Sequence, residues 1–349
     1  MSSDDNARPS TFRVWLLASR PQTLTAAISP VIVSYNLCLS HDPYSNNSLI
    51  PPSSLWVYTL QWVSFCICIQ LGTNLHNDYA DFIKGADNET RVGMARATQK
   101  GWLSPAQTCR GCDVCLMLAL AIGLPLCHSI GGGGWYGLDP CLFLIVISSI
   151  FNAVAYTGGP YPLGYIGLSQ ISIGYTGLGD LFVFLYFGLV ATMTLPYLLL
   201  RSSTHSDALW IDVIWELQAA FYVALPMGFL GTAIIVVNNL RDRNTDVHAQ
   251  KKTLAVRLGA TFCRVEYAML IGGSYIWCWS VLLVEKTFVY RYGLLLLSVP
   301  MAIRLLRAVS GGEKDFGELN PYVGGTAKLQ LVFCILLSIS LRSINKESL

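Results

Sequence analysis

The sequence predicts an all-α polytopic membrane protein with about nine transmembrane helices. Only 13% of its 349 residues are charged and 53% are hydrophobic, whereas soluble domains carry about 25% charged residues. Apolar runs of roughly 15–20 residues recur along the whole chain, close to the length that a helix needs to cross a hydrocarbon core of about 30 Å. Basic residues gather in alternate connections between these runs, as they do in membrane proteins.

The nine apolar runs are spread evenly enough to leave no soluble domain and no long linker. We therefore predict a single transmembrane domain over residues 1–349, with 1–14 as a flexible N-terminal tail. The first twenty residues hold Asp4 and Asp5 and lack an apolar stretch, so they do not resemble a signal peptide. The expected spans are 23–40, 55–73, 113–130, 141–156, 180–200, 217–237, 265–284, 287–303 and 327–341.

The distribution of basic residues tests this count. With the N-terminus inside, the N-terminal segment and the connections 74–112, 157–179, 238–264 and 304–328 share one side, and they hold eighteen of the 23 Lys and Arg residues. Loops on the cytoplasmic side of membrane proteins carry such an excess. The sequence shows no basic patch interleaved with aromatic residues, so we expect no nucleic-acid partner, and it leaves the oligomeric state open.

Two polar clusters end two apolar runs that lie far apart in the chain. The first reads Asn-Leu-His-Asn-Asp-Tyr-Ala-Asp over 74–81, and the second reads Asn-Asn-Leu-Arg-Asp-Arg-Asn-Thr-Asp over 238–246. A spacing of three or four residues places such groups on one face of a helix. Acidic groups at membrane depth are costly and usually mark function. Both clusters fall on the same side of the predicted topology, which favours one shared site.

The residue types in these clusters suit a divalent metal and a polyanion. Mg²⁺ is usually held by one or two carboxylates together with substrate phosphates, so a diphosphate could bridge an ion at each cluster. Asn74 and Asn238, one turn upstream, would add carbonyl oxygens and contact the substrate. The alternative is that these polar groups only cap solvated helix ends, which explains one cluster better than it explains two. The predicted metal ligands are Asp78, Asp81, Asp242 and Asp246.

Cationic and aromatic residues near the clusters complete the predicted site. Arg96, Lys252 and Arg257 are expected to contact diphosphate oxygens, since Arg and Lys form charge-assisted hydrogen bonds with phosphate. Cytoplasmic loops are basic in any case, so topology alone also explains them. Tyr156, at the end of an apolar run, could stabilise a carbocation through its ring, or it could belong to an interfacial aromatic belt.

These strings together resemble the UbiA-type intramembrane prenyltransferases, and the resemblance covers most of the chain. The two Asp motifs are signals of the whole superfamily. The strings Asn-Asn-Leu-Arg-Asp at 238–242 and Lys-Thr-Leu-Ala-Val-Arg-Leu-Gly at 252–259 are more specific to the branch that acts on 1,4-dihydroxy-2-naphthoate. Further matching strings lie at 20–24, 74–87, 91–96, 156–165 and 177–180.

The resemblance implies nine helices around a central cavity and Mg²⁺-dependent transfer of a polyprenyl group. The donor would be a polyprenyl diphosphate and the acceptor 1,4-dihydroxy-2-naphthoate, with release of diphosphate and CO₂, in menaquinone or phylloquinone biosynthesis. Asp78, Asp242 and Tyr156 would be the catalytic residues. The protein would lie among the lipids of a bacterial cell membrane or a plastid membrane, with its site on the cytoplasmic or stromal side.

Two other functions stay open. A UbiA-type enzyme could use another acceptor, such as 4-hydroxybenzoate, homogentisate or haem. An ion-coupled transporter also uses intramembrane carboxylates, but it would carry them in mid-helix, whereas these clusters end their helices beside basic loops. The compact Asp-Gly-x-x-Ala-Arg run of CDP-alcohol phosphotransferases is absent from the sequence.

A short repeat lies in the connection before the span at 180–200. Gly-Tyr-Ile-Gly-Leu at 164–168 recurs as Gly-Tyr-Thr-Gly-Leu at 174–178. Because Gly and Tyr dominate, we expect a tight, mobile connection here.

Overall fold

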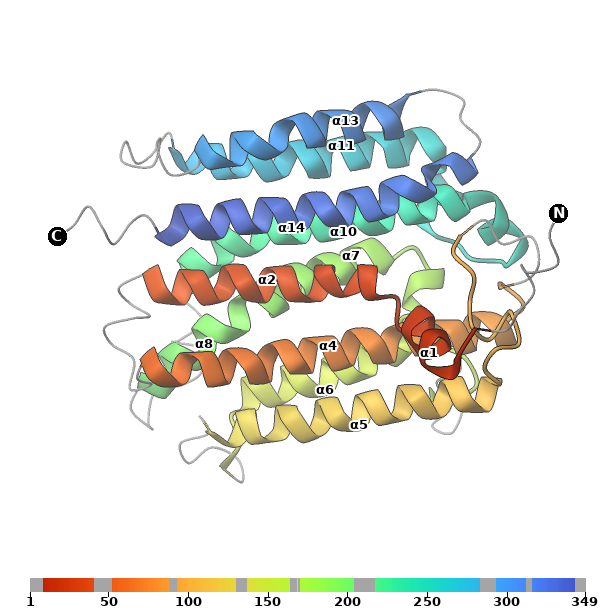
Figure 1. The fold of residues 1–349 in the computed structure, drawn as a ribbon, viewed down its shortest axis with the longest axis horizontal. Coiled ribbons are helices and arrows are strands. Elements are labelled where there is room, and N and C mark those ends of the chain that lie inside the picture. The colour runs from red at the N-terminus through yellow and green to blue at the C-terminus, as the bar shows by residue number, and fades with distance from the viewer. Residues whose placement is uncertain are drawn as a thin grey trace.

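The computed structural model is a bundle of long helices that lie side by side (Figure 1). It describes residues 9–40, 52–87, 93–129, 137–163, 168, 170–203, 217–282, 293–311 and 316–342. Every regular element in these ranges is helical, which confirms the predicted all-α class. Arg91 and most of the first copy of the Gly-Tyr repeat lie outside the described residues.

The helices follow one another in the order that the apolar runs predict. The π-helical η4 joins α7 to α8 without a break, and Gly259 interrupts α11 with non-helical backbone angles. The α-helices are α1 (Thr11–Ser19), α2 (Pro21–Ser40), α4 (Pro52–Ile83), α5 (Pro105–Ser129), α6 (Pro140–Ala155), α7 (Gly179–Val183), α8 (Ala191–Ser203), α10 (Gln218–His248), α11 (Leu254–Leu282), α13 (Val299–Ser310) and α14 (Asn320–Arg342). The remaining helical turns are η3 (Ile173–Tyr175), η4 (Phe184–Val190), η6 (Gly293–Ser298) and η7 (Phe316–Leu319).

Seven helical segments within the described residues are long and apolar enough to cross a membrane. They comprise α2, α4, α5, α7 to α8, α10, η6 with α13, and η7 with α14. Two long helices are not among these seven segments. α6 is apolar but has only 16 residues, and α11 is interrupted at Gly259. The predicted membrane class is therefore confirmed, while the count of nine spans stays a prediction.

The arrangement brings the two polar clusters to one end of the bundle. α4 packs along α5 and α10 along α11, and α2 packs along α14 although the two lie at opposite ends of the chain. In Figure 1 the C-terminal ends of α4 and α10 both lie at the end that also holds α1. These ends carry the residues of 74–81 and 238–246, so the fold places both predicted clusters on one side.

Local sequence signals fix where several helices begin. Ser104 and Gln107 form a reciprocal cap at α5, because the Ser104 hydroxyl accepts the Gln107 N–H and the Gln107 side chain accepts the Ser104 N–H. Asp139 caps α6 by accepting the N–H of Leu142 at 2.9 Å. A proline occupies the first turn of each of these helices, where its missing N–H costs nothing.

The structure differs from the expected N-terminal tail at its end. Residues 11–14 belong to the first turn of α1, whose N-cap Ser10 accepts the Arg13 N–H. Val14 is buried and packs in a small core with Leu75 and Cys112. The burial of Val14 explains why this stretch is ordered. Residues 1–8 lie outside the described residues.

A close helix contact holds η4 against α10. A Cβ built on Gly188 would lie 2.4 Å from the Cα of Gly228, which itself packs against the Phe184 ring. Only glycine permits such an approach, and small residues commonly let membrane helices pack closely. η4 also contributes Tyr186 and Phe187 to the wall of the cavity described below, and π-helical turns often occur at functional sites.

We expect Gly188→Ala to lower stability by about 1–3 kcal/mol, the usual cost of overpacking a tight contact. The melting temperature of the purified protein in detergent would measure it. Gly272→Ala is the matched control, since a Cβ there meets nothing within 4 Å. Equal melting temperatures for the two variants would show that the η4 and α10 contact is not tight.

Candidate active site

A cavity of about 680 Å³ opens between the helices at the end that holds the polar clusters. α2, α4, α6, α7, η4, α10 and α14 all contribute to its wall, together with the turns around Arg96, Tyr175 and Lys251. The polar residues that line it come from the helices near this end of the bundle and from these turns. They include Arg20, Asn74, Asn77, Asp81, Arg96, Tyr156, Tyr175, Asn238, Arg241, Asp242, Asp246 and Lys251.

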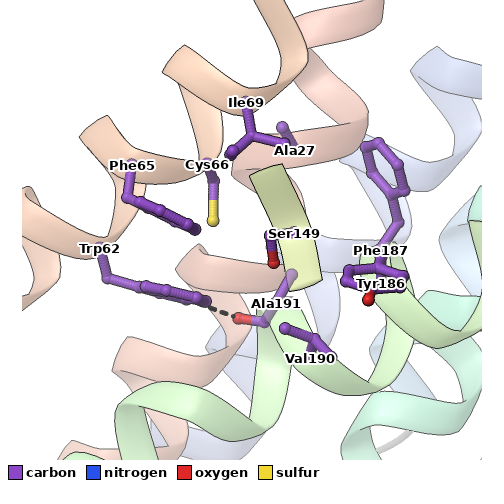
Figure 2. Close-up of a pocket in the computed structure, with 10 residues that line it drawn as sticks. All are labelled: Ala27, Trp62, Phe65, Cys66, Ile69, Ser149, Tyr186, Phe187, Val190 and Ala191. Carbon is purple, nitrogen blue, oxygen red and sulfur yellow. Dashed lines mark hydrogen bonds between the residues drawn. The ribbon is translucent and has the colours of Figure 1, made fainter. Parts of the chain in front are cut away.

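The cavity becomes apolar toward the middle of the bundle. Ile69, Phe187 and Ile234 line it there. A smaller apolar pocket of about 40 Å³ adjoins this region and shares Ile69 and Phe187 with the cavity wall (Figure 2). The Trp62 indole N–H donates to the Ala191 carbonyl at 3.0 Å on the wall of that pocket. One end of the site therefore suits a polyanion and the other a hydrocarbon.

One ammonium group joins the two acidic clusters. Lys251 Nζ lies 3.2 Å from Oδ2 of Asp81, on α4, and 3.9 Å from Oδ1 of Asp246, on α10. Asp81 and Asp246, which are 165 positions apart in the chain, thus approach a single ammonium group. Because both carboxylates lie within 4 Å of one ammonium nitrogen, a single cation can contact both of them.

Tyr175 organises the same corner of the cavity. Its hydroxyl donates to Oδ1 of Asp81 at 2.8 Å. Its ring lies beneath two ammonium groups, with Lys84 Nζ at 4.1 Å and Lys251 Nζ at 4.8 Å from the ring centroid, close enough for cation–π attraction. Lys84 also donates to the Thr157 carbonyl and, at 3.2 Å, to the Ser172 hydroxyl.

Burial and charge move the pKa values of these loop residues in different directions. Burial lowers the pKa of the Lys84 ammonium below its ordinary value, although Asp81 partly offsets this. Burial also opposes the charge of Lys251, but the carboxylates of Asp81, Asp246 and Asp87 outweigh it and raise the pKa of that ammonium. Burial, followed by the Asp81 charge, raises the pKa of the Tyr175 hydroxyl, which therefore stays a donor.

Asp242 is held by its neighbour Arg241. The guanidinium donates to both carboxylate oxygens, at 2.8 and 2.6 Å. The same guanidinium donates to the side-chain oxygens of Asn238 and Asn320, both at 2.9 Å. Asp242 and Asn238, which were both predicted as site residues, line the cavity. The hydrogen bonds from Arg241 fix the orientation of their side chains.

Asp78, unlike Asp81, does not line the cavity. Asp78 is only 1% exposed and is not among the described residues that line the cavity. Its carboxylate accepts the backbone N–H groups of Ala97 and Thr98 at 3.2–3.4 Å. It therefore holds the turn that carries Arg96, whose side chain does reach the cavity and lies 3.4 Å from a carboxylate oxygen of Asp87.

Asn74 lines the cavity, but its side chain is used within the protein. Its amide nitrogen donates to the Ser19 carbonyl and the Thr23 hydroxyl, both at 2.9 Å, and its oxygen accepts from Gln70 at 3.0 Å. Asn74 thus ties α4 to the junction of α1 and α2. Asn77, three residues further along α4, also lines the cavity, and its side-chain oxygen accepts the Thr157 hydroxyl.

Lys252 and Arg257 lie behind the turn that carries Tyr175. The Lys252 N–H donates to the Tyr175 carbonyl at 2.9 Å, and a Cβ on Gly177 would approach Nε of Arg257 at 3.5 Å. Neither residue is among the described residues of the cavity wall, whereas Lys251 is.

Tyr156 lines the cavity where the sequence predicts an aromatic residue of the site. The Gly174 N–H donates to the Tyr156 carbonyl at 2.7 Å. A Cβ on Gly174 would come within 3.0 Å of the Tyr156 ring, so glycine is needed for this contact. The second copy of the Gly-Tyr repeat therefore contacts two residues of the cavity wall: Gly174 packs against Tyr156, and Tyr175 donates to Asp81.

Several polar residues of the cavity wall were not among the predicted site residues, including Arg20, Asn77, Tyr175, Arg241 and Lys251. Of these, Asn77 carried a signal in the sequence. Asn77 and Asp81 show the same four-residue spacing as Asn238 and Asp242. Lys251 stands directly beside Lys252, and the sequence offers no reason to choose between adjacent lysines.

The donor set of the cavity fits Mg²⁺. Asp81, Asp242 and Asp246 supply carboxylates, and Asn77 and Asn238 supply amide oxygens, which are the hard ligands that this ion prefers. Among the described residues, no three or more His, Cys, Asp or Glu side chains are grouped so that they could hold a metal ion. Mg²⁺ is usually held by one or two carboxylates together with substrate phosphates.

The chain is similar to known proteins over nearly its full length. Residues 44–315 match the UbiA prenyltransferase family. The chain is 30% identical over 334 residues to the 1,4-dihydroxy-2-naphthoate octaprenyltransferase of Escherichia coli (strain K12), covering 94% of this chain and 95% of that protein. It is 28% identical over 325 residues to the protein of the same name from Mycobacterium leprae (strain TN), covering 93% and 95%.

The fold has a counterpart among solved structures. A UbiA homolog from Archaeoglobus fulgidus, solved bound to DMAPP and Mg²⁺, superposes with a TM-score of 0.53 at 13% identity, over 93% of this chain and 99% of that one. At this identity the likeness supports the fold alone. The family match covers well over half of the chain, and the predicted family is confirmed: the chain belongs to the UbiA prenyltransferase family and is a prenyltransferase.

Proposed function

We propose that this enzyme transfers a polyprenyl group from a polyprenyl diphosphate to 1,4-dihydroxy-2-naphthoate, with Mg²⁺, and releases diphosphate and CO₂. The observation that carries the proposal is the position of Lys251, which contacts a carboxylate from each acidic cluster beside a cavity with a polar and an apolar end. The names of the E. coli and M. leprae relatives support the acceptor.

The residues of the polar end divide into metal ligands and their supports. Asp81, Asp242 and Asp246 are the candidate carboxylate ligands, of which one or two would hold a Mg²⁺ ion together with the diphosphate, and Asn77 and Asn238 are candidate amide ligands. When bound, Mg²⁺ neutralises the charge that develops on the departing diphosphate. The supporting residues would be Asn74, which holds the α1–α2 junction, Asp78, which holds the turn of Arg96, and Lys252, whose N–H holds the turn of Tyr175. Arg257 lies beside Gly177 of that turn.

Cations on the cavity wall would bind the diphosphate. Arg96 and Lys251 face the cavity from two different turns, and charge-assisted hydrogen bonds from both suit phosphate oxygens. Tyr156 lies on the same wall, where its ring would face the allylic carbon as the C–O bond breaks. Attraction between a cation and an aromatic face stabilises that carbon.

The transfer balances without a separate proton acceptor. The allylic C–O bond breaks and the electron pair leaves with diphosphate. The electron-rich ring carbon that bears the carboxylate bonds to the allylic carbon, and the bond to the carboxylate breaks as CO₂ leaves. The ring keeps that electron pair, so the enzyme needs to position the acceptor and exclude water rather than remove a ring proton.

The apolar end would take the first isoprene units of the donor. Ile69, Phe187 and Ile234 line it, and the remaining tail would pass between helices toward lipid. The protein would function as an integral membrane protein of a bacterial or plastid membrane, with the polar end on the cytoplasmic or stromal side, as the excess of basic residues at that end supports.

Mass spectrometry of the products tests the proposal. Purified protein receives Mg²⁺, prenyl diphosphates of several lengths and one acceptor at a time. We expect a product from 1,4-dihydroxy-2-naphthoate whose mass is that of the prenylated acceptor less CO₂. A product only from 4-hydroxybenzoate or homogentisate would contradict the acceptor. Ion flux across proteoliposomes with no product from any acceptor would contradict prenyl transfer.

A further inference from the structure

The main chain on both sides of Lys251 is anchored, which fixes the origin of its side chain. The Lys251 N–H donates to the Asp246 carbonyl at 2.9 Å, and the next N–H, of Lys252, donates to the Tyr175 carbonyl at 2.9 Å. Gln250, just before, adopts a positive φ of 56°, which turns the chain back sharply after α10. The turn therefore aims this one side chain at the acidic residues.

The ammonium lies where a divalent ion shared by the two clusters would have to bind. It is 3.2 Å from Asp81 and 3.9 Å from Asp246, and only 17% of the side chain is exposed. Mg²⁺ binds oxygens at about 2.0–2.1 Å, so an ion that ligates both carboxylates must occupy the space between them. Two cations cannot share that space, and the ammonium has to move for the ion to bind.

The cavity offers the displaced ammonium a second partner. The Tyr175 ring already lies 4.8 Å from Nζ, and Arg96 also lines the cavity, so an anion there would meet a second cation. A diphosphate that arrives with the metal brings the negative charge that the ammonium loses when it leaves Asp81 and Asp246. The same lysine can thus neutralise carboxylates first and phosphate afterwards.

We propose that Lys251 couples metal binding to diphosphate binding by occupying the metal position until both ligands arrive. This inference rests on the proposed function and concerns the order of binding at the same site. The side chain competes with a metal ion alone and assists a metal ion that comes with diphosphate. Linkage requires that the coupling be reciprocal, so diphosphate must tighten metal binding as much as metal tightens diphosphate binding.

Mn²⁺ binding measured by electron paramagnetic resonance tests this without turnover. The wild-type protein is titrated with Mn²⁺ alone and with Mn²⁺ plus inorganic diphosphate. For Lys251→Met we expect tighter binding of Mn²⁺ alone, by roughly tenfold, and a tightening by diphosphate that is smaller by about the same factor, within the usual range of coupling between sites. A merely structural lysine would weaken both titrations.

Two variants make the result specific. Lys251→Gln keeps a hydrogen-bond donor and removes the charge, so it should behave like Lys251→Met, and a melting temperature near that of wild type would show that it folds. Lys100→Met removes an exposed lysine from the turn after Arg96 and should leave both titrations unchanged.

The outcomes separate the two proposals. If wild-type protein binds Mn²⁺ with diphosphate but both Lys251 variants bind Mn²⁺ alone no more tightly than wild type, the coupling role is wrong and the proposed function stands. If wild-type protein binds no Mn²⁺ even with diphosphate, the metal-dependent function itself is contradicted.

Discussion

Asp81→Asn is expected to lower the rate of prenyl transfer by roughly 10²–10³-fold, the usual loss when one preorganised electrostatic group is removed from a site. Asp81 faces the cavity, contacts Lys251 and accepts the Tyr175 hydroxyl. The asparagine keeps the shape but loses the charge that a metal needs. Turnover of prenyl diphosphate at saturating Mg²⁺ would measure the loss, with a melting temperature close to that of wild type.

Asp78→Asn is the matched comparison, because Asp78 and Asp81 lie only three residues apart in α4. Asp78 accepts two backbone N–H groups of the turn at 97–98, and an amide cannot accept both as well. We expect a stability loss of about 1–3 kcal/mol, the cost of a buried donor left unsatisfied, and a smaller loss of rate than for Asp81→Asn. The reverse order of rates would contradict the assignment of Asp81 as the ligand.

Asp139→Ala is expected to give the largest loss of stability, about 3–5 kcal/mol, because it strands a buried charge. Asp139 is fully buried and caps the start of α6, which lies at the end of the bundle opposite α1 (Figure 1). It accepts from Nε of Arg201 at 3.1 Å and from the Tyr197 hydroxyl at 2.9–3.0 Å. Thermal melting in detergent measures the loss, and turnover at low temperature should persist.

A double variant tests the reason for that loss. Arg201→Met removes the stranded guanidinium, so Asp139→Ala combined with Arg201→Met should be more stable than Asp139→Ala alone, as expected for residues that interact directly. If the double variant loses the sum of the two single effects, Asp139 acts as a helix cap and not as the partner of Arg201.

The fold was largely predictable from composition and periodicity. Long apolar runs specify helices of membrane length whatever their detailed packing, and the basic loops orient them. The start of α1 was missed because residues 11–14 are too few to form an apolar run. A signal was present in Ser10, which caps the helix. What makes the helix pack is the burial of Val14 against Leu75, a contact between distant residues that no local pattern shows.

The candidate site was predictable at the level of clusters but not of single residues. Asn74 with Asp78 and Asn77 with Asp81 have the same four-residue spacing, so periodicity cannot say which pair faces the cavity. The tertiary contacts decide it, because the turn at 97–98 and the α1–α2 junction take up Asp78 and Asn74. Their assignment as supports, and that of Asp81 and Asn77 as ligands, stays a prediction.

The role of Tyr175 in the site could not be predicted from the sequence. Its position within a short repeat suggests a mobile connection and hides its contacts with Asp81 and Lys84. A residue of this kind is recognised only when the fold brings the turn at 173–175 to the end of α4.

The measurement that tests the account most directly is Mn²⁺ binding, in the presence of inorganic diphosphate, to Asp81→Asn and Asp246→Asn. If the ends of α4 and α10 form one site, each substitution alone should weaken Mn²⁺ binding at least roughly tenfold, as losing a ligand or its immediate support typically does. Both substitutions should weaken the binding of the same Mn²⁺ ions. If either variant keeps wild-type binding, or each loses a separate and independent ion, the two acidic clusters do not form a single site.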